Sequence, residues 1–482
     1  MEIKLNYLNI QEARELLDAG KITSLQLTEA CLQRIEDVNP KLNAVLTVCS
    51  ERAIAEAIEA DKRLMNGERL PLLGIPYVCK DNITTKGVRT TAASKMLENY
   101  IAPYDASIIK KLHEAGAVLL GKTNLDEFAH GASTENSAYG PTANPWDLSR
   151  VAGGSSGGSA ASVAADLCIF AIGSDTGGSI RYPAAFCGVV GYKPAYGAVS
   201  RFGLLSMTSS TDVIGPITKT VEDAATVYNI IAGSDAKDGT TYSGEREVTG
   251  VPDVKGLRIG LPKQYFIEGL NPEIKKSLDK FVSDLENAGA IVSEVDLPYT
   301  DYGIAVYYII TPSEISSNLA RFDGIGWGYQ SPETKDLQDF YKKSRGQGFG
   351  PEAKRRIMLG TYALSSGYYD AYYKKAQAVR TLICQDFARV FENCDLLLTP
   401  TAPHPAFKIG EKVNDPLAMY LEDIFVTGAS LAGLPAMSLP SGLLDGLPIA
   451  GQIIAPRLGE NNLFTVANFL ENKNKIIRNN SL

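Results

Sequence analysis

The segment Gly153–Arg181 limits the possible folds of this chain more than any other part of its sequence. It reads GGSSGGSAASVAADLCIFAIGSDTGGSIR, in which two glycine–serine clusters flank a run of small residues and a short apolar segment. This pattern predicts a helix of small residues at 156–165, a strand at Ile169–Ile172 and a glycine-rich turn at Gly173–Gly178. Glycines at this density cost backbone entropy, so they are typical of places where a backbone approaches a ligand or presents its N–H groups. A tight turn against a close-packed helix would explain one glycine pair, but two serine-bearing clusters favour a site.

Strands and helices alternate along most of the chain, which predicts an α/β fold. The expected helices are Asn9–Ala19, Ser24–Val38 with Ser24 as its N-cap, Arg52–Met65, Asp105–Ala115, Pro272–Ala288, a long stretch at Pro351–Asn393 and a last one from Asn462. The other expected strands are Ala117–Leu120, Leu257–Leu261, Ile291–Val295, Leu396–Leu398, Ala436–Leu439 and Ala450–Ile454. Residues 1–68 form an N-terminal helical segment, and the polar stretch Gly233–Gly256 is a predicted surface excursion. Because strands occur on both sides of that excursion, one interrupted domain and two domains fit equally well.

The composition argues against several classes of protein. The chain has 482 residues with only 3 histidines, so metal centres and histidine triads are not expected. Its 7 cysteines show no paired spacing, which indicates reduced thiols and a cytoplasmic protein. No secretory signal and no run of about 18 apolar residues is present, so no membrane span is expected. A formal net charge of −8 argues against a broad nucleic-acid-binding face on this chain.

Two motif matches compete with the glycine–serine clusters. Gly116–Thr123 (GAVLLGKT) fits the phosphate-loop pattern letter for letter, but its four central residues predict a strand rather than a loop that cradles phosphate. Gly153–Gly158 contains two overlapping G-x-S-x-G patterns, centred on Ser155 or Ser156. A hydrolase nucleophile elbow needs a strand before the serine and a histidine base. The preceding PTANPWDLSRVAG predicts a loop, although His404 lies downstream in the required chain order.

A lysine is the candidate base for a serine nucleophile, because histidine is so scarce. The turn Asp175–Ser179 can bring several N–H groups together beside a hydroxyl, as an oxyanion hole requires. Lys80 follows the apolar run of GIPYVCKDN, and burial lowers a lysine pKa from about 10.4 toward the roughly 7–8 of catalytic lysines. A lysine at a strand end that pairs with Asp81 explains the same spacing equally well.

Three segments, Gly74–Asn82, Gly153–Ala161 and Gly173–Pro194, resemble the amidase signature family in order and in spacing. The resemblance implies one large α/β domain over residues 1–482, with a mixed central β-sheet flanked by helices on both faces. It implies a Ser–cis-Ser–Lys catalytic set. Its further implied residues are the nucleophile Ser179, the bridging Ser155 after a cis peptide, the base Lys80, the oxyanion-hole N–H groups of Thr176, Gly177 and Gly178, and the supporting Asp175 and Arg181.

Other blocks resemble one branch of that family, the A subunits of glutamyl-tRNA(Gln)/aspartyl-tRNA(Asn) amidotransferases. They are the N-terminal helices, Asn124–Asp147, Ser313–Gly328 and Lys354–Arg380. The resemblance implies a glutaminase whose ammonia converts Glu-tRNA(Gln), Asp-tRNA(Asn) or both to Gln-tRNA(Gln) and Asn-tRNA(Asn). It implies a heterotrimer in which a B subunit holds the tRNA and uses ATP and Mg²⁺, and a small C subunit clasps the pair. No cofactor is expected in this chain itself.

A glutaminase must also bind the α-carboxylate and the α-ammonium of its substrate. The resemblance assigns Arg356 to the carboxylate, Asp423 to the ammonium and Tyr307 to a hydrogen bond. The adjacent residues Arg355, Glu422 and Tyr308 compete for these roles. His130 is a departure from the family pattern, since a methionine is expected there. Motifs from residue 80 to residue 423 then converge on one site, which favours one domain. The alternatives are a stand-alone amidase of broad specificity and a nucleotide-binding module at Gly116–Thr123.

Overall fold

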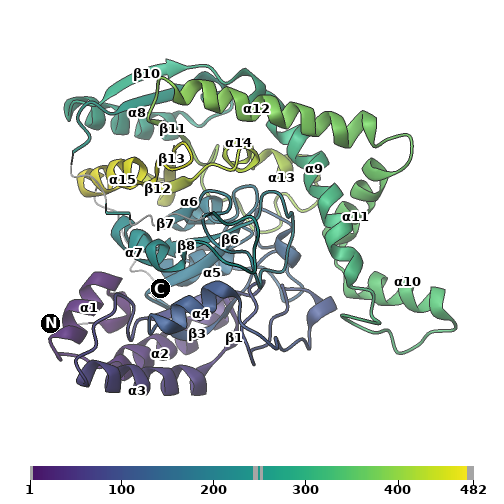
Figure 1. Cartoon of the computed structure of the whole chain (residues 1–482), viewed down its shortest axis with the longest axis horizontal. Coiled ribbons are helices and arrows are strands. Elements are labelled where there is room, and N and C mark those ends of the chain that lie inside the picture. Colours follow the sequence, from purple (N-terminus) through teal and green to yellow (C-terminus); the bar gives the residue numbers. More distant parts are fainter. Residues whose placement is uncertain (1–3, 243–247, 250–252, 475–482) are drawn as a thin grey trace.

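A computed structural model of the chain describes residues 4–242, 248–249 and 253–474 (Figure 1). Part of the predicted excursion at 233–256 therefore lies outside the described residues. The helices of the described residues are α1 (Ile10–Asp18), α2 (Ser24–Leu42), α3 (Ser50–Met65), α4 (Ser107–Glu114), α5 (Gly157–Ala164), α6 (Arg181–Cys187), α7 (Val221–Ile231), α8 (Pro272–Asn287), α9 (Gly303–Asn318), α10 (Leu337–Gly348), α11 (Pro351–Leu364), α12 (Lys375–Phe391), α13 (Pro416–Leu421), α14 (Thr427–Leu431) and α15 (Glu460–Asn474). None of these helices is both long and apolar enough to cross a membrane.

The centre of the molecule is a mixed eleven-stranded sheet with the order β1-β3-β2-β6-β8-β7-β12-β13-β11-β9-β10. Its strands are β1 (Val45–Val48), β2 (Pro76–Lys80), β3 (Val118–Thr123), β6 (Phe170–Asp175), β7 (Val190–Lys193), β8 (Val213–Thr218), β9 (Arg258–Pro262), β10 (Ile291–Val295), β11 (Leu396–Pro400), β12 (Ala436–Leu444) and β13 (Leu447–Ile454). In Figure 1 the sheet runs from β10 at the top to β1 at the bottom. The predicted α/β class and mixed sheet are confirmed.

Helices cover both faces of this sheet. Strand β2 pairs in parallel with β3 on one side and with β6 on the other. The crossovers β2–α4–β3 and β3–α5–β6 therefore run in opposite directions along the sheet, and right-handed crossovers then place α4 and α5 on opposite faces. Strand β6, which is parallel to β2 and antiparallel to β8, is buried along its whole length, as expected for a central strand covered on both faces.

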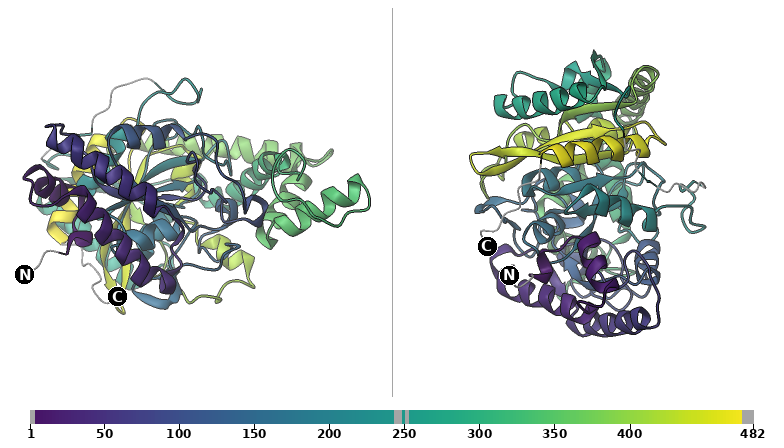
Figure 2. Two further views of the ribbon diagram at one scale, coloured as in Figure 1. Left: turned by 90° about the horizontal axis from the view of Figure 1, so that it is seen from below. Right: turned by 90° about the vertical axis from the view of Figure 1, so that its left-hand side faces the viewer.

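Helices α9, α10 and α11 form an arm beside the sheet. Figure 1 and the left view of Figure 2 both show α10 and α11 extending away from the strands at the right. Helix α9 packs along α11 and against α12, and it also contacts α14. The arm therefore brings residues from 303–364 to the edge of the sheet.

Several sequence predictions need correction at their ends. Helix α2 is capped by Thr23, whose hydroxyl accepts from the backbone of Gln26, rather than by Ser24, and it continues past Val38 to Leu42. The long helical stretch predicted for 351–393 is broken after Leu364, where α11 ends and a short π-helical turn leads into α12. The break coincides with the local sequence Ser365-Ser366-Gly367, in which Gly367 has a φ of +87° that favours glycine.

The composition of the segment before the first glycine–serine cluster predicted a loop, and this prediction is wrong. Strands β4 (Ala143–Asn144) and β5 (Asp147–Val151) form a small antiparallel ribbon outside the main sheet. The phosphate-loop match at Gly116–Thr123 does not form a phosphate-binding loop. Its residues Val118–Thr123 are strand β3, and the Lys122 side chain is fully buried, with Nζ 2.6 Å from the carbonyl oxygen of Ile83. No lysine is left there to hold a phosphate.

Candidate active site

The carboxyl ends of two parallel strands bring the first candidate residues together. Lys80 is the last residue of β2 and Asp175 is the last residue of β6, and the two strands are neighbours. Ser155 lies two residues before α5, which returns along the sheet to β6. Crevices outside the carboxyl ends of strands are where open α/β sheets bind their ligands.

Lys80 is fully buried and surrounded by oxygen atoms. Its Nζ lies 2.7 Å from Ser155 Oγ, 2.8 Å from Ser156 Oγ and 3.0 Å from Ser174 Oγ. The carbonyl oxygen of Ser174 is 3.2 Å away. Burial lowers the pKa of Lys80 to about 7, although the nearby carboxylates Asp126, Asp175 and Asp212 oppose this shift. Near neutral pH the amine is therefore available as a base.

The hydrogen bonds around Nζ leave its lone pair to the hydroxyl of Ser155 or to that of Ser174, whose oxygen accepts from the Asn82 side chain. A neutral amine has two N–H donors and one lone pair. The carbonyl of Ser174 can only accept, and the Ser156 hydroxyl donates to that carbonyl over 3.0 Å, so its oxygen accepts from Nζ. Ser155 Oγ has no other hydrogen-bond partner among the described residues, so its proton can point at Nζ. The peptide bond Gly154–Ser155 is cis, as the family resemblance implies.

Ser179 is the member of the set that solvent reaches. It is 7% exposed, whereas Lys80 and Ser155 are completely buried. The backbone of Ser179 is held next to the first cluster, because its carbonyl accepts from the N–H of Ser156 over 3.0 Å. No hydrogen bond joins the Ser155 and Ser179 hydroxyls in the described part of the chain. Hydrogen bonds between catalytic groups often form or shorten only when substrate is bound.

The turn before Ser179 presents free backbone donors. The N–H groups of Thr176, Gly177 and Ser179 have no acceptor among the residues that the structure describes. The N–H of Gly178 differs from the sequence prediction, because it donates to Asp175 Oδ1 over 2.9 Å. Gly178 therefore stabilises the turn, and Ser179 replaces it in the set of donors that could face an oxyanion.

Close packing explains both glycines of this turn. A Cβ on Gly177 would lie 2.4 Å from the Tyr307 ring, and a Cβ on Gly178 would lie 2.3 Å from the Val426 side chain. Gly178 also has a φ of +136°, which side chains rarely adopt. Tyr307, from α9, is thus pressed directly against the donor turn.

Asp175 and Arg181 form a buried pair behind the turn. Asp175 also accepts from the N–H groups of Gly178 and Ile180, and Arg181 Nη2 lies 3.0 Å from its carboxylate. Burial alone would raise the pKa of Asp175, but the charge and hydrogen bonds of Arg181 outweigh it and lower the pKa to about 2. Arg181 also donates to Gln452 in β13, so this pair connects the turn to the C-terminal strands.

The three proposed substrate-binding residues meet at the base of the arm. Arg356 is 3% exposed and lies over the rings of Tyr308 and Tyr420, with centroid distances of 5.3 and 5.5 Å. Its Nε donates to Glu352 over 2.8 Å, while its two terminal nitrogens have no acceptor among the described residues. The Tyr308 hydroxyl donates to Asp423 over 2.7 Å. Burial raises the pKa of Asp423 to about 7, against the opposing effects of Tyr308 and Arg356.

The structure separates these residues from their neighbours in sequence. Arg355 projects outward with a side chain that is 43% exposed. Glu422 points away from Arg356, toward His404 and Lys412. Tyr307 and Tyr308 both belong to the site, since one covers the donor turn and the other holds Asp423.

Histidine chemistry has no place in this arrangement. His404 Nε2 lies 3.0 Å from Glu422 Oε1, and its Nδ1 lies 2.9 Å from the Pro405 carbonyl, so it serves neither serine of the G-x-S-x-G match. His113 has a 66% exposed side chain. In the described part of the chain no group of three or more His, Cys, Asp or Glu residues is placed to hold a metal ion.

Sequence reasoning missed several residues that contact the site. Ser156 and Ser174 both bond to Lys80, and Asp212 accepts from the Thr176 hydroxyl over 2.7 Å. The two serines lie inside the glycine–serine segment, whose density could have indicated them. Asp212 comes from an ordinary loop sequence that carries no such signal.

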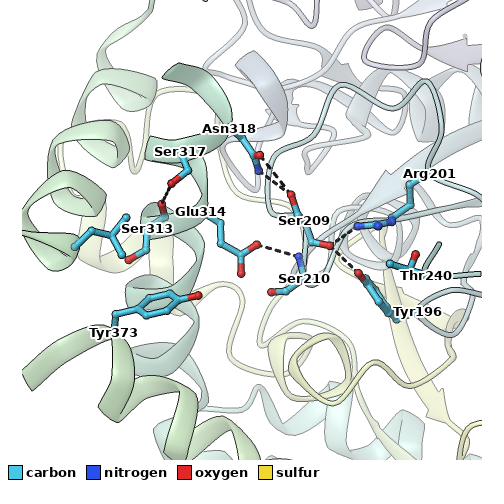
Figure 3. Close-up of a pocket in the computed structure, with 11 residues that line it drawn as sticks. Tyr196, Arg201, Ser209, Ser210, Thr240, Ser313, Glu314, Ser317, Asn318 and Tyr373 are labelled. Atoms are coloured by element: carbon cyan, nitrogen blue, oxygen red, sulfur yellow. Dashed lines mark hydrogen bonds between the residues drawn. The ribbon is translucent and has the colours of Figure 1, made fainter. Parts of the chain in front are cut away.

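Asp212 ends a loop that also lines a groove of about 560 Å³. Figure 3 shows the wall of this groove, where Glu314 of α9 accepts from the Ser210 N–H over 2.9 Å. Tyr196 donates to the Ser209 carbonyl from the other side of the loop over 2.8 Å. The loop therefore has the groove on one face and the donor turn on the other.

A buried lysine and serine pair next to a second serine that solvent just reaches, below a turn of free N–H groups, defines a class of amide-cleaving serine enzymes. The chain belongs to the amidase family, whose model, described as Amidase, matches residues 26–464. A similar curated protein is the A subunit of glutamyl-tRNA(Gln) amidotransferase from Carboxydothermus hydrogenoformans, 54% identical over 97% of this chain and 98% of that protein. The crystal structure of the corresponding A subunit from Thermotoga maritima is 41% identical with a TM-score of 0.80, and covers 98% of this chain and 96% of that one. The peptide amidase of Stenotrophomonas maltophilia is 31% identical with a TM-score of 0.83, over 98% and 97% of the two chains.

Proposed function

We propose that this chain is the glutaminase subunit of a tRNA-dependent amidotransferase. The observation that carries the proposal is the combination of two arrangements at one sheet edge. The Lys80–Ser155 pair next to Ser179 supplies the means to cleave an amide. Arg356 and Asp423, of opposite charge and both buried, supply partners for the carboxylate and the ammonium of an α-amino acid. Glutamine and asparagine both have a carboxamide and a zwitterionic end that would fit such a pair, and the names of the similar subunits favour glutamine.

The first half of the reaction forms an ester on Ser179. Neutral Lys80 takes the proton of Ser155, and Ser155 takes the proton of Ser179 as its oxygen attacks the carboxamide carbon. The carbonyl oxygen then carries a negative charge, and the N–H groups of Thr176, Gly177 and Ser179 stabilise it. The C–N bond breaks, the proton returns through Ser155 to the departing nitrogen, and ammonia leaves.

The second half of the reaction restores the enzyme. Water replaces ammonia, gives its proton to the same Ser155–Lys80 relay and attacks the ester carbon. The bond between that carbon and Ser179 Oγ breaks, Ser179 regains its proton, and glutamate leaves. Arg356 and Asp423 hold the amino acid end in place throughout, and Tyr307 keeps the donor turn in position.

The ammonia serves a transamidation that other subunits complete. We infer that a B subunit binds Glu-tRNA(Gln), Asp-tRNA(Asn) or both, activates the aminoacyl carboxylate with ATP and Mg²⁺, and that a small C subunit completes a heterotrimer. The net charge of −8 supports this division, because the tRNA would be held mainly by another chain. All seven cysteines are free thiols, which supports a reducing compartment such as the cytoplasm.

The test uses the chain co-expressed with candidate B and C subunits. The purified complex should release ammonia from glutamine, and Ser179→Ala should abolish that release without altering the size of the complex. A Ser179→Ala complex that retains near-normal turnover would refute the assignment. A monomer that cleaves simple aryl amides and ignores glutamine would instead support a stand-alone amidase.

A further inference from the structure

His130 is a fully buried imidazole whose two ring nitrogens both lack a hydrogen-bond partner among the described residues. Leaving a buried polar group unpaired is costly because its interactions with water are lost, so such groups in native proteins call for an explanation. The other two histidines pose no such question, since His113 is exposed and His404 is bonded through both nitrogens. The unpaired atoms of His130 point to a ligand.

Ring contacts connect His130, through Phe128, to the residues just before the helix that carries Arg356. His130 follows the short 3-10 turn Glu127–Ala129, and its backbone carbonyl accepts from Asn136 over 2.9 Å. Its ring lies 6.3 Å from the ring of Phe128, which in turn packs against Phe349, two residues before α11. His130 is therefore joined through two aromatic contacts to the start of α11, and it feels the charge of Arg356 on that helix.

The surroundings of His130 determine the protonation state of its ring. Burial, reinforced by the positive charge of Arg356, holds the pKa of His130 well below its usual range, so the imidazole is neutral. A neutral imidazole offers one N–H donor and one acceptor nitrogen. The terminal nitrogens of Arg356 also have no acceptor among the described residues. A carboxylate between the two side chains could accept hydrogen bonds from both.

We propose that His130 is a specificity-determining residue of the substrate site, whose ring N–H donates to the α-carboxylate of glutamine next to Arg356. This inference rests on the proposed glutaminase function and deepens it. His130 takes no part in the Lys80 relay and acts only on the amino acid end of the substrate. Its loss should therefore weaken glutamine binding and leave the chemical step largely unchanged.

The kinetic test compares two substrates on the assembled complex. One is L-glutamine and the other is 4-aminobutanamide, which is glutamine without its α-carboxylate. His130→Met fills the same space without a donor and should raise KM for glutamine by about 10-fold or more, with kcat changed only a few-fold. KM for 4-aminobutanamide should stay within about twofold. His130→Gln, which restores an N–H, should recover much of the loss. Equal effects on both substrates, or an unchanged KM for glutamine, would overturn the inference.

A spectroscopic test does not depend on turnover. The Ser179→Ala complex, with isotope-labelled histidine in this chain alone, gives imidazole signals from only 3 histidines, and His130→Met identifies the signal of interest. Adding glutamine should shift the His130 signal and leave those of His113 and His404 in place. Calorimetry measures whether glutamine binds. If glutamine binds but the His130 signal does not move, the inference about His130 is overturned and the proposed function is not. Failure of the wild-type complex to hydrolyse glutamine would overturn the proposed function and this inference with it.

Discussion

At the scale of single residues, burial gives the site its chemistry. Burial lowers the pKa of Lys80 to about 7, so its amine can be neutral near that pH, and the oxygens of Ser155, Ser156 and Ser174 surround it. Asp423 has a pKa of about 7 for the same reason, since burial disfavours its charge. Both groups change protonation in the range where the enzyme would work.

The rate should therefore fall in acid with a slope that depends on the substrate. The pKa of Lys80 is lowered to about 7, so the neutral base is lost as the pH falls below that value. The pKa of Asp423 is raised to about 7, so the carboxylate that binds the α-ammonium is lost over the same range. For glutamine, log kcat/KM should approach a slope of about 2 below pH 7, and above it a plateau.

Glutaramate, which is glutamine without its α-amino group, is the matched control. It does not need the Asp423 charge, so its slope should be about 1. The measurement is initial ammonia release across about pH 5–9. A rate for either substrate that stays constant between about pH 6 and 8 would contradict a lysine base.

The sequence supports part of this residue-scale account. The apolar run before Lys80 predicts its burial, and the turn after β6 predicts converging N–H groups. The choice between a base and an Asp81 partner was open on spacing alone. The structure excludes the Asp81 pairing, because Asp81 accepts from Thr91 and lies near Lys122 while Nζ of Lys80 contacts the serines. The contacts of the Lys80 amine join segments that are 75 or more residues apart, and local patterns do not encode them.

At the scale of elements, the donor turn depends on its neighbours. Tyr307 of α9 packs on Gly177, and Asp212 at the end of the groove loop holds Thr176 by its hydroxyl. Asp212 also accepts from the backbone of Met207 and Thr208, so one carboxylate shapes the loop and fixes the turn. The geometry of the oxyanion donors therefore depends on a segment without catalytic groups.

Asp212→Asn should lower kcat by about 10–100-fold, because a displaced donor turn stabilises the oxyanion less well. KM for glutamine should change little, since Asp212 does not face the amino acid end. Glu314→Ala, which releases Ser210 on the groove side of the same loop, should lower kcat only a few-fold. Steady-state kinetics on the assembled complex measure both. A larger loss of kcat in the Glu314 variant than in the Asp212 variant would contradict the prediction that Asp212 affects the donor turn more strongly.

Element types were easier to predict than element ends. Strand–helix–strand units such as 257–295 show clear apolar periodicity, and the structure confirms them. The sequence does not predict the ribbon of β4 and β5, because its residues favour turns. In the structure, Val151 of β5 packs into a buried cluster with Tyr182 and Phe186. Packing overrides local preference at such places.

At the scale of the whole molecule, the two halves of the chain contribute strands to one sheet and residues to one candidate site. Strand β7 from the first half pairs with β12 from the second. Behind the turn, Arg181 bonds to Asp175, to Gln452 of β13 and to Ser430 of α14. Motifs from both halves therefore meet across a continuous core.

Arg181→Met should lower the free energy of unfolding by about 3–5 kcal/mol, because it leaves the carboxylate of Asp175 buried without its partner. Lys275→Met removes half of an exposed pair on α8 and should have a much smaller effect. Chemical denaturation followed by circular dichroism measures both variants. Similar losses in the two would show that the buried pair does not join the halves.

The central claim is that Ser179, activated through Ser155 by Lys80, carries the glutamyl group during turnover. The most direct measurement is rapid acid quench of the complex during glutamine turnover, followed by mass spectrometry of its peptides. The account predicts one glutamyl ester, on Ser179, that is absent from the Ser179→Ala and Lys80→Met complexes. A glutamyl group on Ser155, on Ser156 or on any other residue, or its persistence in the Ser179→Ala complex, would contradict the account.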